Sequence, residues 1–230
     1  MDYEITGGST FPVVKINLNT GEAIKAESGA MVALSEGLEL KGKMEGGLKR
    51  SIGRMFSGES FFMQSIEAVE KDGWALLSTT QLGTIAPLEV ASGDEWILQK
   101  AAFVAASTDV EVSTKVQSLT RGFLSGEGFF VIRLSGAGTT FISTYGSMHE
   151  IDVPAGQSVL VDNGHLVAWR ADMKYEIAKG AKSWVSSVTS GEGLACRFYG
   201  PGTIKIQTRS PRDFGKWIQQ FMPPPPKTSN

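Results

Sequence analysis

The chain has 230 residues, of which 41% are hydrophobic and 20% are charged, and its formal net charge is −2. This length and composition fit one larger all-β domain or two small ones, with a substantial core. The near-neutral charge excludes a general attraction to nucleic acid or to anionic membranes, so binding of that kind needs a local basic patch.

Short apolar runs separated by turn residues begin near the N-terminus. The run 11–18 ends at Asn19-Thr20-Gly21, residues that tolerate the positive φ of a tight turn, and this pattern predicts a strand, a turn and a strand. Three segments then share a strand, a tight turn and a strand of small residues: 23–34, 97–106 and 159–169. A further strand with period-two alternation follows each of them, at 38–42, 110–114 and 175–178.

The phrase Ser-Gly-Glu occurs three times. Its glycines lie 68 and 65 residues apart, and its members are Gly58 and Glu59, Gly126 and Glu127, and Gly191 and Glu192. This regular spacing predicts three tandem β-sandwich-like repeats, over about 9–90, 91–153 and 154–209, in a single domain of residues 1–222. We interpret the phrase as structural, because Gly permits a left-handed or bulged backbone and the Glu carboxylate can accept backbone N–H groups.

A short connector precedes each copy of this phrase. In the first connector, 48–56, the apolar residues fall on one face of a predicted helix, with Lys49, Arg50 and Arg54 around it. These cations permit peripheral contact with an anionic membrane or with nucleic acid. We favour the alternative, in which the apolar face packs on the sheet and the cations face water, because the helix is short and contains a glycine.

The last regular element is a predicted C-terminal helix over 211–222. Ser210 is a suitable N-cap and Pro211 a suitable first residue. One face carries Phe214, Trp217, Ile218 and Phe221, which we expect to dock against the chain itself or a neighbouring subunit rather than a separate partner. The Pro-rich tail 223–230 cannot continue the helix and is expected to be disordered.

Several of these motifs together resemble a widespread bacterial family of unknown function, related to a fungal protein named for altered inheritance of mitochondria. They are the opening 3–8, the turn 27–31, Gly126-Glu127-Gly128, the turn 162–165 and the closing run 200–208. The resemblance covers about residues 3–221. It implies three units of the fold of the trp RNA-binding attenuation protein, a short double-stranded β-helix, in a pseudo-threefold arrangement, and further trimeric or ring-like assembly. It implies no catalytic residues and no RNA binding.

Residues capable of chemistry are sparse. His149 and His165 are the two histidines, and neither lies in a recognisable metal-ligand spacing, so we expect them to be solvated or hydrogen-bonded. Cys196, the single cysteine, shares strand parity with Leu194 and Phe198 and is expected to be a buried hydrophobe. Gly126-Glu127-Gly128 leads into a strand, which argues against a phosphate-binding loop. We therefore predict no catalytic residues, no metal and no cofactor.

The preferred interpretation is a non-enzymatic structural or interaction protein that self-associates. The alternative is a module that binds a small ligand or nucleic acid, and an enzyme is the least favoured class. The N-terminal sequence lacks the basic and apolar regions of a signal peptide, so a cytoplasmic location is expected.

Overall fold

The computed structural model describes residues 1–43, 63–117, 129–177 and 195–223. Within these ranges, strands β1 to β19 form four sheets with antiparallel pairing, and one α-helix, α3 (Pro211–Gln219), lies near the C-terminus. The predicted all-β class with a C-terminal helix is confirmed. The predicted connector helix at 48–56 lies outside the described residues.

The strands fall into three groups of six, and β1 (Asp2–Thr6) is added to the edge of the first group. The first group is β2 (Val13–Leu18), β3 (Ala23–Glu27), β4 (Met31–Leu34), β5 (Leu38–Lys43), β6 (Met63–Ala68) and β7 (Gly73–Leu77). The second is β8 (Ile85–Val90), β9 (Trp96–Gln99), β10 (Phe103–Ser107), β11 (Val110–Gln117), β12 (Phe129–Gly136) and β13 (Gly138–Ser143). The third is β14 (Met148–Val153), β15 (Ser158–Asp162), β16 (Leu166–Arg170), β17 (Tyr175–Ile177), β18 (Ala195–Tyr199) and β19 (Gly202–Gln207).

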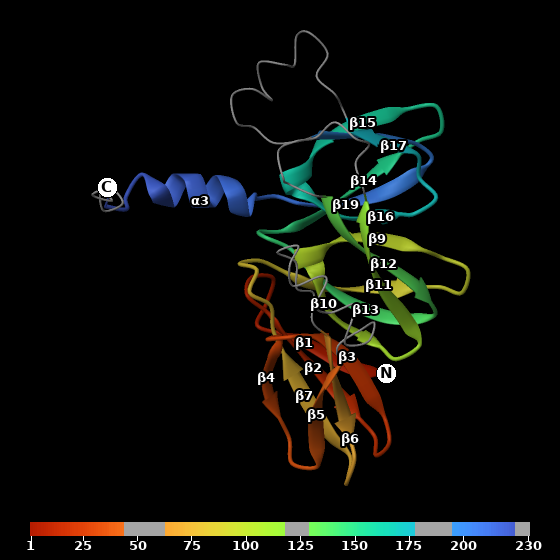
Figure 1. Ribbon diagram of the computed structural model, residues 1–230, viewed down its shortest axis with the longest axis vertical. Coiled ribbons are helices and arrows are strands. Elements are labelled where there is room, and N and C mark those ends of the chain that lie inside the picture. Colours follow the sequence, from red (N-terminus) through yellow and green to blue (C-terminus); the bar gives the residue numbers. More distant parts are fainter. Residues whose placement is uncertain (44–62, 118–128, 178–194, 224–230) are drawn as a thin grey trace, which may run out of the picture.

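Strand pairing follows one scheme in all three groups. The first, sixth and third strands of a group pair in that order, as in β2-β7-β4, and the fourth, fifth and second pair as in β5-β6-β3. The second strand also pairs with the third strand of the next group, so β3 pairs with β10 and β9 pairs with β16. Each six-stranded sheet is therefore shared by two groups, and the groups follow one another along the long axis of the molecule (Figure 1).

Alternation of apolar residues explains which faces these strands bury. In β2, Val14, Ile16 and Leu18 are buried on one face, and in β3 Ile24 and Ala26 are. Gly21 has a φ of 88° in the turn between these two strands, a conformation that a residue with a Cβ rarely adopts.

Compact turns link the second strand of a group to its third. In the second and third groups they are 3-10 turns, η1 (Lys100–Ala102) and η2 (Asn163–His165). The carboxylate of Asp162 accepts a 2.7 Å hydrogen bond from the backbone N–H of Gly164 and so caps η2.

The core continues through the shared sheets. Val104, Ala105 and Phe141 of the second group pack with the core of the first group, and the ring of Phe141 contacts Tyr3 with centroids 4.9 Å apart. In the third group Trp169 packs edge-on against Phe198 at 5.4 Å. Cys196 is fully buried in this third core, as predicted.

Candidate interaction surfaces

The C-terminal helix α3 begins where the sequence predicts. Ser210 is buried, and its hydroxyl accepts a 3.3 Å hydrogen bond from the N–H of Asp213, with Pro211 in the first turn. The helix ends at Gln219 rather than at residue 222, so the predicted length is wrong. The N–H groups of residues 220–222 bond to carbonyls three residues back, which makes this stretch a turn, and Pro223 disfavours helical geometry just before it.

The apolar face of α3 is largely exposed. Phe214 and Trp217 form a row of ring contacts with Phe221 of the turn that follows the helix, with centroids 5.9 and 5.1 Å apart. Phe214 also contacts Tyr145 of the body at 5.8 Å, whereas Trp217 is 52% and Phe221 70% exposed. The expected docking of this face on the chain itself is thus limited to its first turn, with Ile218 half-buried, and the helix projects from the body (Figure 1).

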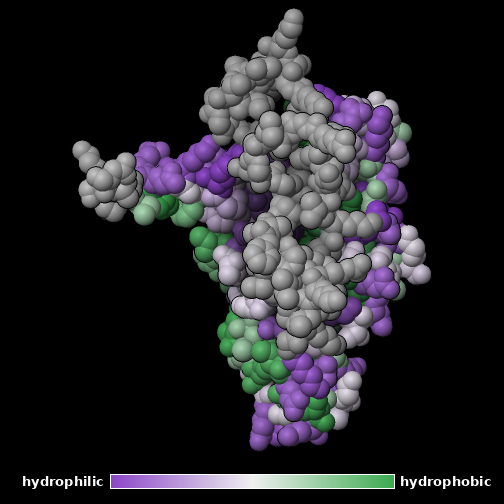
Figure 2. All heavy atoms as spheres, in the orientation of Figure 1, coloured by the Kyte–Doolittle hydropathy of each residue, from purple (hydrophilic) through white to green (hydrophobic). Residues whose placement is uncertain are grey.

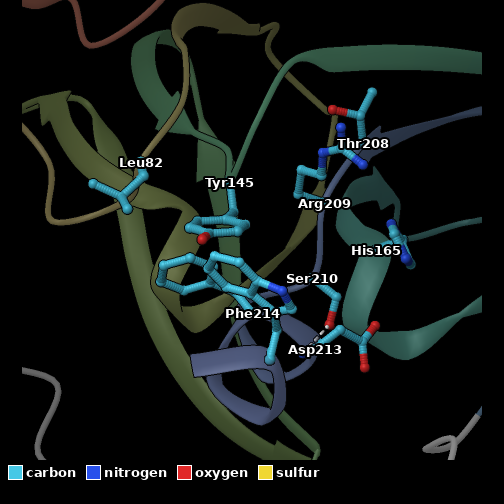
Figure 3. A pocket seen from close by; sticks show the side chains of 9 residues that line it. Leu82, Tyr145, His165, Thr208, Arg209, Ser210, Asp213 and Phe214 are labelled. Carbon is cyan, nitrogen blue, oxygen red and sulfur yellow. Dashed lines mark hydrogen bonds between the residues drawn. The ribbon is translucent and has the colours of Figure 1, made fainter. Parts of the chain in front are cut away.

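A cavity of about 420 Å³ lies where α3 meets the body. Figure 3 shows the rings of Tyr145 and Phe214 against one another, with Arg209 and His165 farther along the wall. His165 Nδ1 lies 2.7 Å from the carbonyl oxygen of Gln207, so this histidine is hydrogen-bonded, as expected. The Gln207 side chain donates to the carbonyl of Gly164 and accepts from the N–H of Tyr145, which links η2 to a residue that lines the cavity.

In the described part of the chain, no three His, Cys, Asp or Glu side chains are placed to hold a metal ion. Burial raises the pKa of the Cys196 thiol to about 12. Burial also raises the pKa of Glu27 to about 7, an effect partly offset by the charge of Lys100. Glu27 lies at the end of β3, where the first group meets the second.

The strand β4 presents an apolar edge to solvent. Its sequence is Met-Val-Ala-Leu, yet Met31 is 39% and Val32 is 52% exposed. The corresponding strands β10 and β16 are covered by β3 and β9, and the equivalents of Val32, which are Val104 and Val167, are buried. Among the described strands, β4 pairs with β7 alone. Hydrophobic surface gathers over the lower part of the molecule, where this group lies, and on the underside of α3 (Figure 2).

The strand β15 is a second sheet edge, at the opposite end of the molecule (Figure 1). It carries Val159, Leu160 and Val161, of which the first two are half-buried. Its equivalents β3 and β9 each have a partner on both sides, whereas in the described part of the chain β15 pairs with β18 alone. The two ends of the molecule therefore carry apolar strands, β4 and β15, whose equivalents in the other groups lie inside a sheet.

Three of the seven predicted interaction residues, Lys49, Arg50 and Arg54 of the basic connector, lie outside the described ranges. The residues predicted to be structural in the Ser-Gly-Glu phrases also lie outside them: Gly58, Glu59, Gly126, Glu127, Gly191 and Glu192. Of the four predicted on α3, Phe214, Trp217 and Phe221 are exposed. The sequence carries no signal for the β4 edge, because an apolar run such as 31–34 has the same pattern whether or not another strand covers it.

None of the helices in the described ranges has the length and apolar character that crossing a bilayer requires.

One family model and two proteins of Streptococcus pyogenes match nearly the whole chain. A family model described as "Mitochondrial biogenesis AIM24" matches residues 3–209. An uncharacterized protein of Streptococcus pyogenes serotype M6 is 29% identical over 231 residues, which cover 97% of this chain and 92% of that protein. The X-ray crystal structure of protein SPYM3_0169 from Streptococcus pyogenes superposes with a TM-score of 0.79 at 29% identity, covering 96% of this chain and 99% of the other.

Proposed function

We propose that this chain, which belongs to the AIM24 family, is a non-enzymatic structural protein that associates with further copies of itself. The observation that carries the proposal is the exposed apolar strand β4, whose equivalents β10 and β16 are buried by a neighbouring strand. An exposed apolar edge strand favours pairing with another chain, because its backbone groups and its side chains both gain a partner.

The described groups with reactive potential support a structural role. The Cys196 thiol is buried with a pKa of about 12, and so it is a poor nucleophile near neutral pH. His165 is engaged with the backbone of Gln207. These side chains serve packing and local hydrogen bonding.

Solution mass tests the proposal directly. We expect light scattering coupled to size-exclusion chromatography to give a multiple of the 24.7 kDa chain mass for the native protein. Val32→Lys should reduce that mass, because a charge at this edge opposes strand addition. Val69→Lys is the matched control, since Val69 is also exposed but lies outside the β4 edge. A native chain that stays at 24.7 kDa at high concentration would overturn self-association.

The same measurement separates β4 from α3. Trp217→Glu places a charge in the apolar face of the helix, and Gln219→Glu places one at a position outside that row of rings. We expect both variants to keep the native mass. A mass that falls with Trp217→Glu but not with Val32→Lys would locate the association on α3 instead of β4.

A further inference from the structure

The two shared sheets show how one strand group receives the next. In the first shared sheet, Ala105 of β10 lies opposite Ala26 of β3, and in the second, Ala168 of β16 lies opposite Leu98 of β9. We call β10 and β16 the receiving strands, and β3 and β9 the donating strands. In both sheets the third residue of the receiving strand faces the next-to-last residue of the donating strand. Two internal junctions therefore use one antiparallel register.

The receiving strands share a second feature, an irregularity at the same position. The pairing register shifts between the first and third residues of β10 and of β16, at Phe103/Ala105 and Leu166/Ala168. The same shift occurs in β4, between Met31 and Ala33. The outer strand β4 is thus built like the two receiving strands and differs from them in having no strand added to it among the described residues.

The two terminal half-sheets complement one another. One has the order β1-β2-β7-β4 and ends at a receiving strand, and the other has the order β15-β18-β17 and begins with a donating strand. Joined at these strands, they give β17-β18-β15-β4-β7-β2, the same order as in both internal sheets, with β1 added at the end. We infer that β15 of one copy adds to β4 of another, antiparallel, with Val161 opposite Ala33 and Leu160 opposite Leu34. This assignment rests on the proposed self-association and names its two surfaces.

Charge separates β4, and β15 apart from its last residue, from the other sheet edges that are described. The six remaining edge strands each carry at least one charged residue: β1 has Glu4, β5 has Glu39, β8 has Glu89, β11 has Glu111, β14 has Glu150 and β17 has Glu176. Charged side chains at an edge discourage the addition of another strand. In contrast, β4 contains no charge, and the one charged residue of β15, Asp162, lies at its end and caps η2. The charge that protects the other edges is thus absent from β4 and from residues 158–161 of β15.

This pairing joins different surfaces at opposite ends of the molecule (Figure 1). Such a contact is heterologous, so each added copy leaves one β4 and one β15 for the next copy. Copies then build a ring if the rotation between neighbours closes, and an open filament if it does not. An isologous dimer through β4 alone is a different arrangement, and the experiment below distinguishes the two.

Cysteine cross-linking between separate chains tests the inferred register. Residues that face one another in an antiparallel pair have Cα atoms about 4.5 to 5.5 Å apart, within the range that a disulfide bridges. When Leu34→Cys and Leu160→Cys proteins are mixed and oxidised with diamide, we expect a covalent dimer of twice the 24.7 kDa chain mass on a non-reducing gel. Wild type carries Cys196 alone, which is buried, and should remain uncrosslinked.

A register control accompanies this mixture. Leu34→Cys mixed with Val161→Cys should give at least tenfold less dimer, because neighbouring residues of a strand point to opposite faces of the sheet. Ala33→Cys with Val161→Cys is a second matched pair, which keeps the test available if a leucine variant fails to fold. The circular dichroism spectrum of each variant establishes that it is folded before mixing.

Each outcome decides the inference. Efficient dimers of Leu34→Cys alone, or of Leu160→Cys alone, would overturn it in favour of an isologous contact. Failure of both matched pairs to cross-link while the native solution mass stays a multiple of 24.7 kDa would overturn the strand pairing and leave self-association standing. A native chain that is monomeric throughout would overturn both.

Discussion

The strands β4 and β10 occupy the same place in two strand groups, yet one is exposed and the other is buried. Phe103, Val104, Ala105 and Ala106 of β10 are almost completely inaccessible, because β3 covers the edge of the strand and its sheet packs on both faces. Met31 and Val32 of β4 are equally apolar and remain in contact with water. Burial of a strand in this fold therefore depends on the neighbouring strand group rather than on the apolar character of the strand itself.

The largest expected difference comes from a charge placed at the equivalent position of the two strands. Val104→Lys should lower the free energy of unfolding by about 4 kcal/mol or more, because it buries an unpaired ammonium group in the core. Val32→Lys should change it by about 0.5 kcal/mol or less in dilute, dissociated protein. Urea unfolding followed by circular dichroism measures both. Equal losses would mean that β4 is as enclosed as β10.

Truncation of the first side chain of each strand to alanine should likewise lower the free energy of unfolding more in β10 than in β4. Phe103 is fully buried, and Phe103→Ala should cost about 3 to 5 kcal/mol through lost burial and the cavity left behind. Met31→Ala should cost about 1 kcal/mol or less, since much of the side chain is already solvated. The midpoint of urea unfolding reports both effects, and a Met31→Ala loss near that of Phe103→Ala would contradict the comparison.

The free energy of unfolding should depend on pH through Glu27, which lies where the first strand group meets the second. Burial raises the pKa of Glu27 from its ordinary value of 4.5 to about 7, so the folded chain retains a proton that the unfolded chain releases. The stability from protonated Glu27 is therefore full below about pH 4.5 and is lost as the pH rises through 7. Allowing for partial exposure, we expect this loss to be about 1 to 2 kcal/mol.

Thermal unfolding in that pH window measures the Glu27 contribution. Glu27→Gln should flatten the pH dependence between pH 4.5 and 7, whereas Glu4→Gln, at an exposed position on β1, should leave the wild-type curve unchanged. A Glu27→Gln curve parallel to that of wild type would show that Glu27 ionises as an ordinary surface carboxyl.

The smallest expected effect concerns ion pairs. At the β9–β16 junction the Arg170 guanidinium lies 2.5 and 2.7 Å from the two carboxylate oxygens of Asp94 and stands over the Trp96 ring. Asp94→Asn should cost about 1 kcal/mol, because a two-point pair held against a ring is better ordered than a surface contact. Glu36→Gln, which breaks the exposed pair with Lys71, should cost about 0.3 kcal/mol or less. Equal losses of unfolding free energy in the two variants would show that the Asp94–Arg170 pair stabilises the protein no more than an exposed ion pair does.

Local features of the chain were predictable because they depend on neighbours in sequence. Period-two alternation predicted the strands at 38–42 and 110–114, and the structure places β5 and β11 there. Ser210 and Pro211 predicted the start of α3, and strand parity predicted the burial of Cys196. The end of α3 was predicted too late, since the last helical bonds before Pro223 gave way to turn bonds.

The all-β class, the start of the helix and the family all follow from the amino-acid sequence. Long-range strand pairing sets the rest: β3 covers β10, β9 covers β16, and β4 and β15 lie at the two ends of the strand order. The physical reason is that alternation assigns a side chain to a face of a strand, whereas the strand at its edge is chosen by pairing between residues far apart in the chain. Met31 and Phe103 therefore each begin an apolar run in the sequence, yet the first is exposed in the fold and the second is buried.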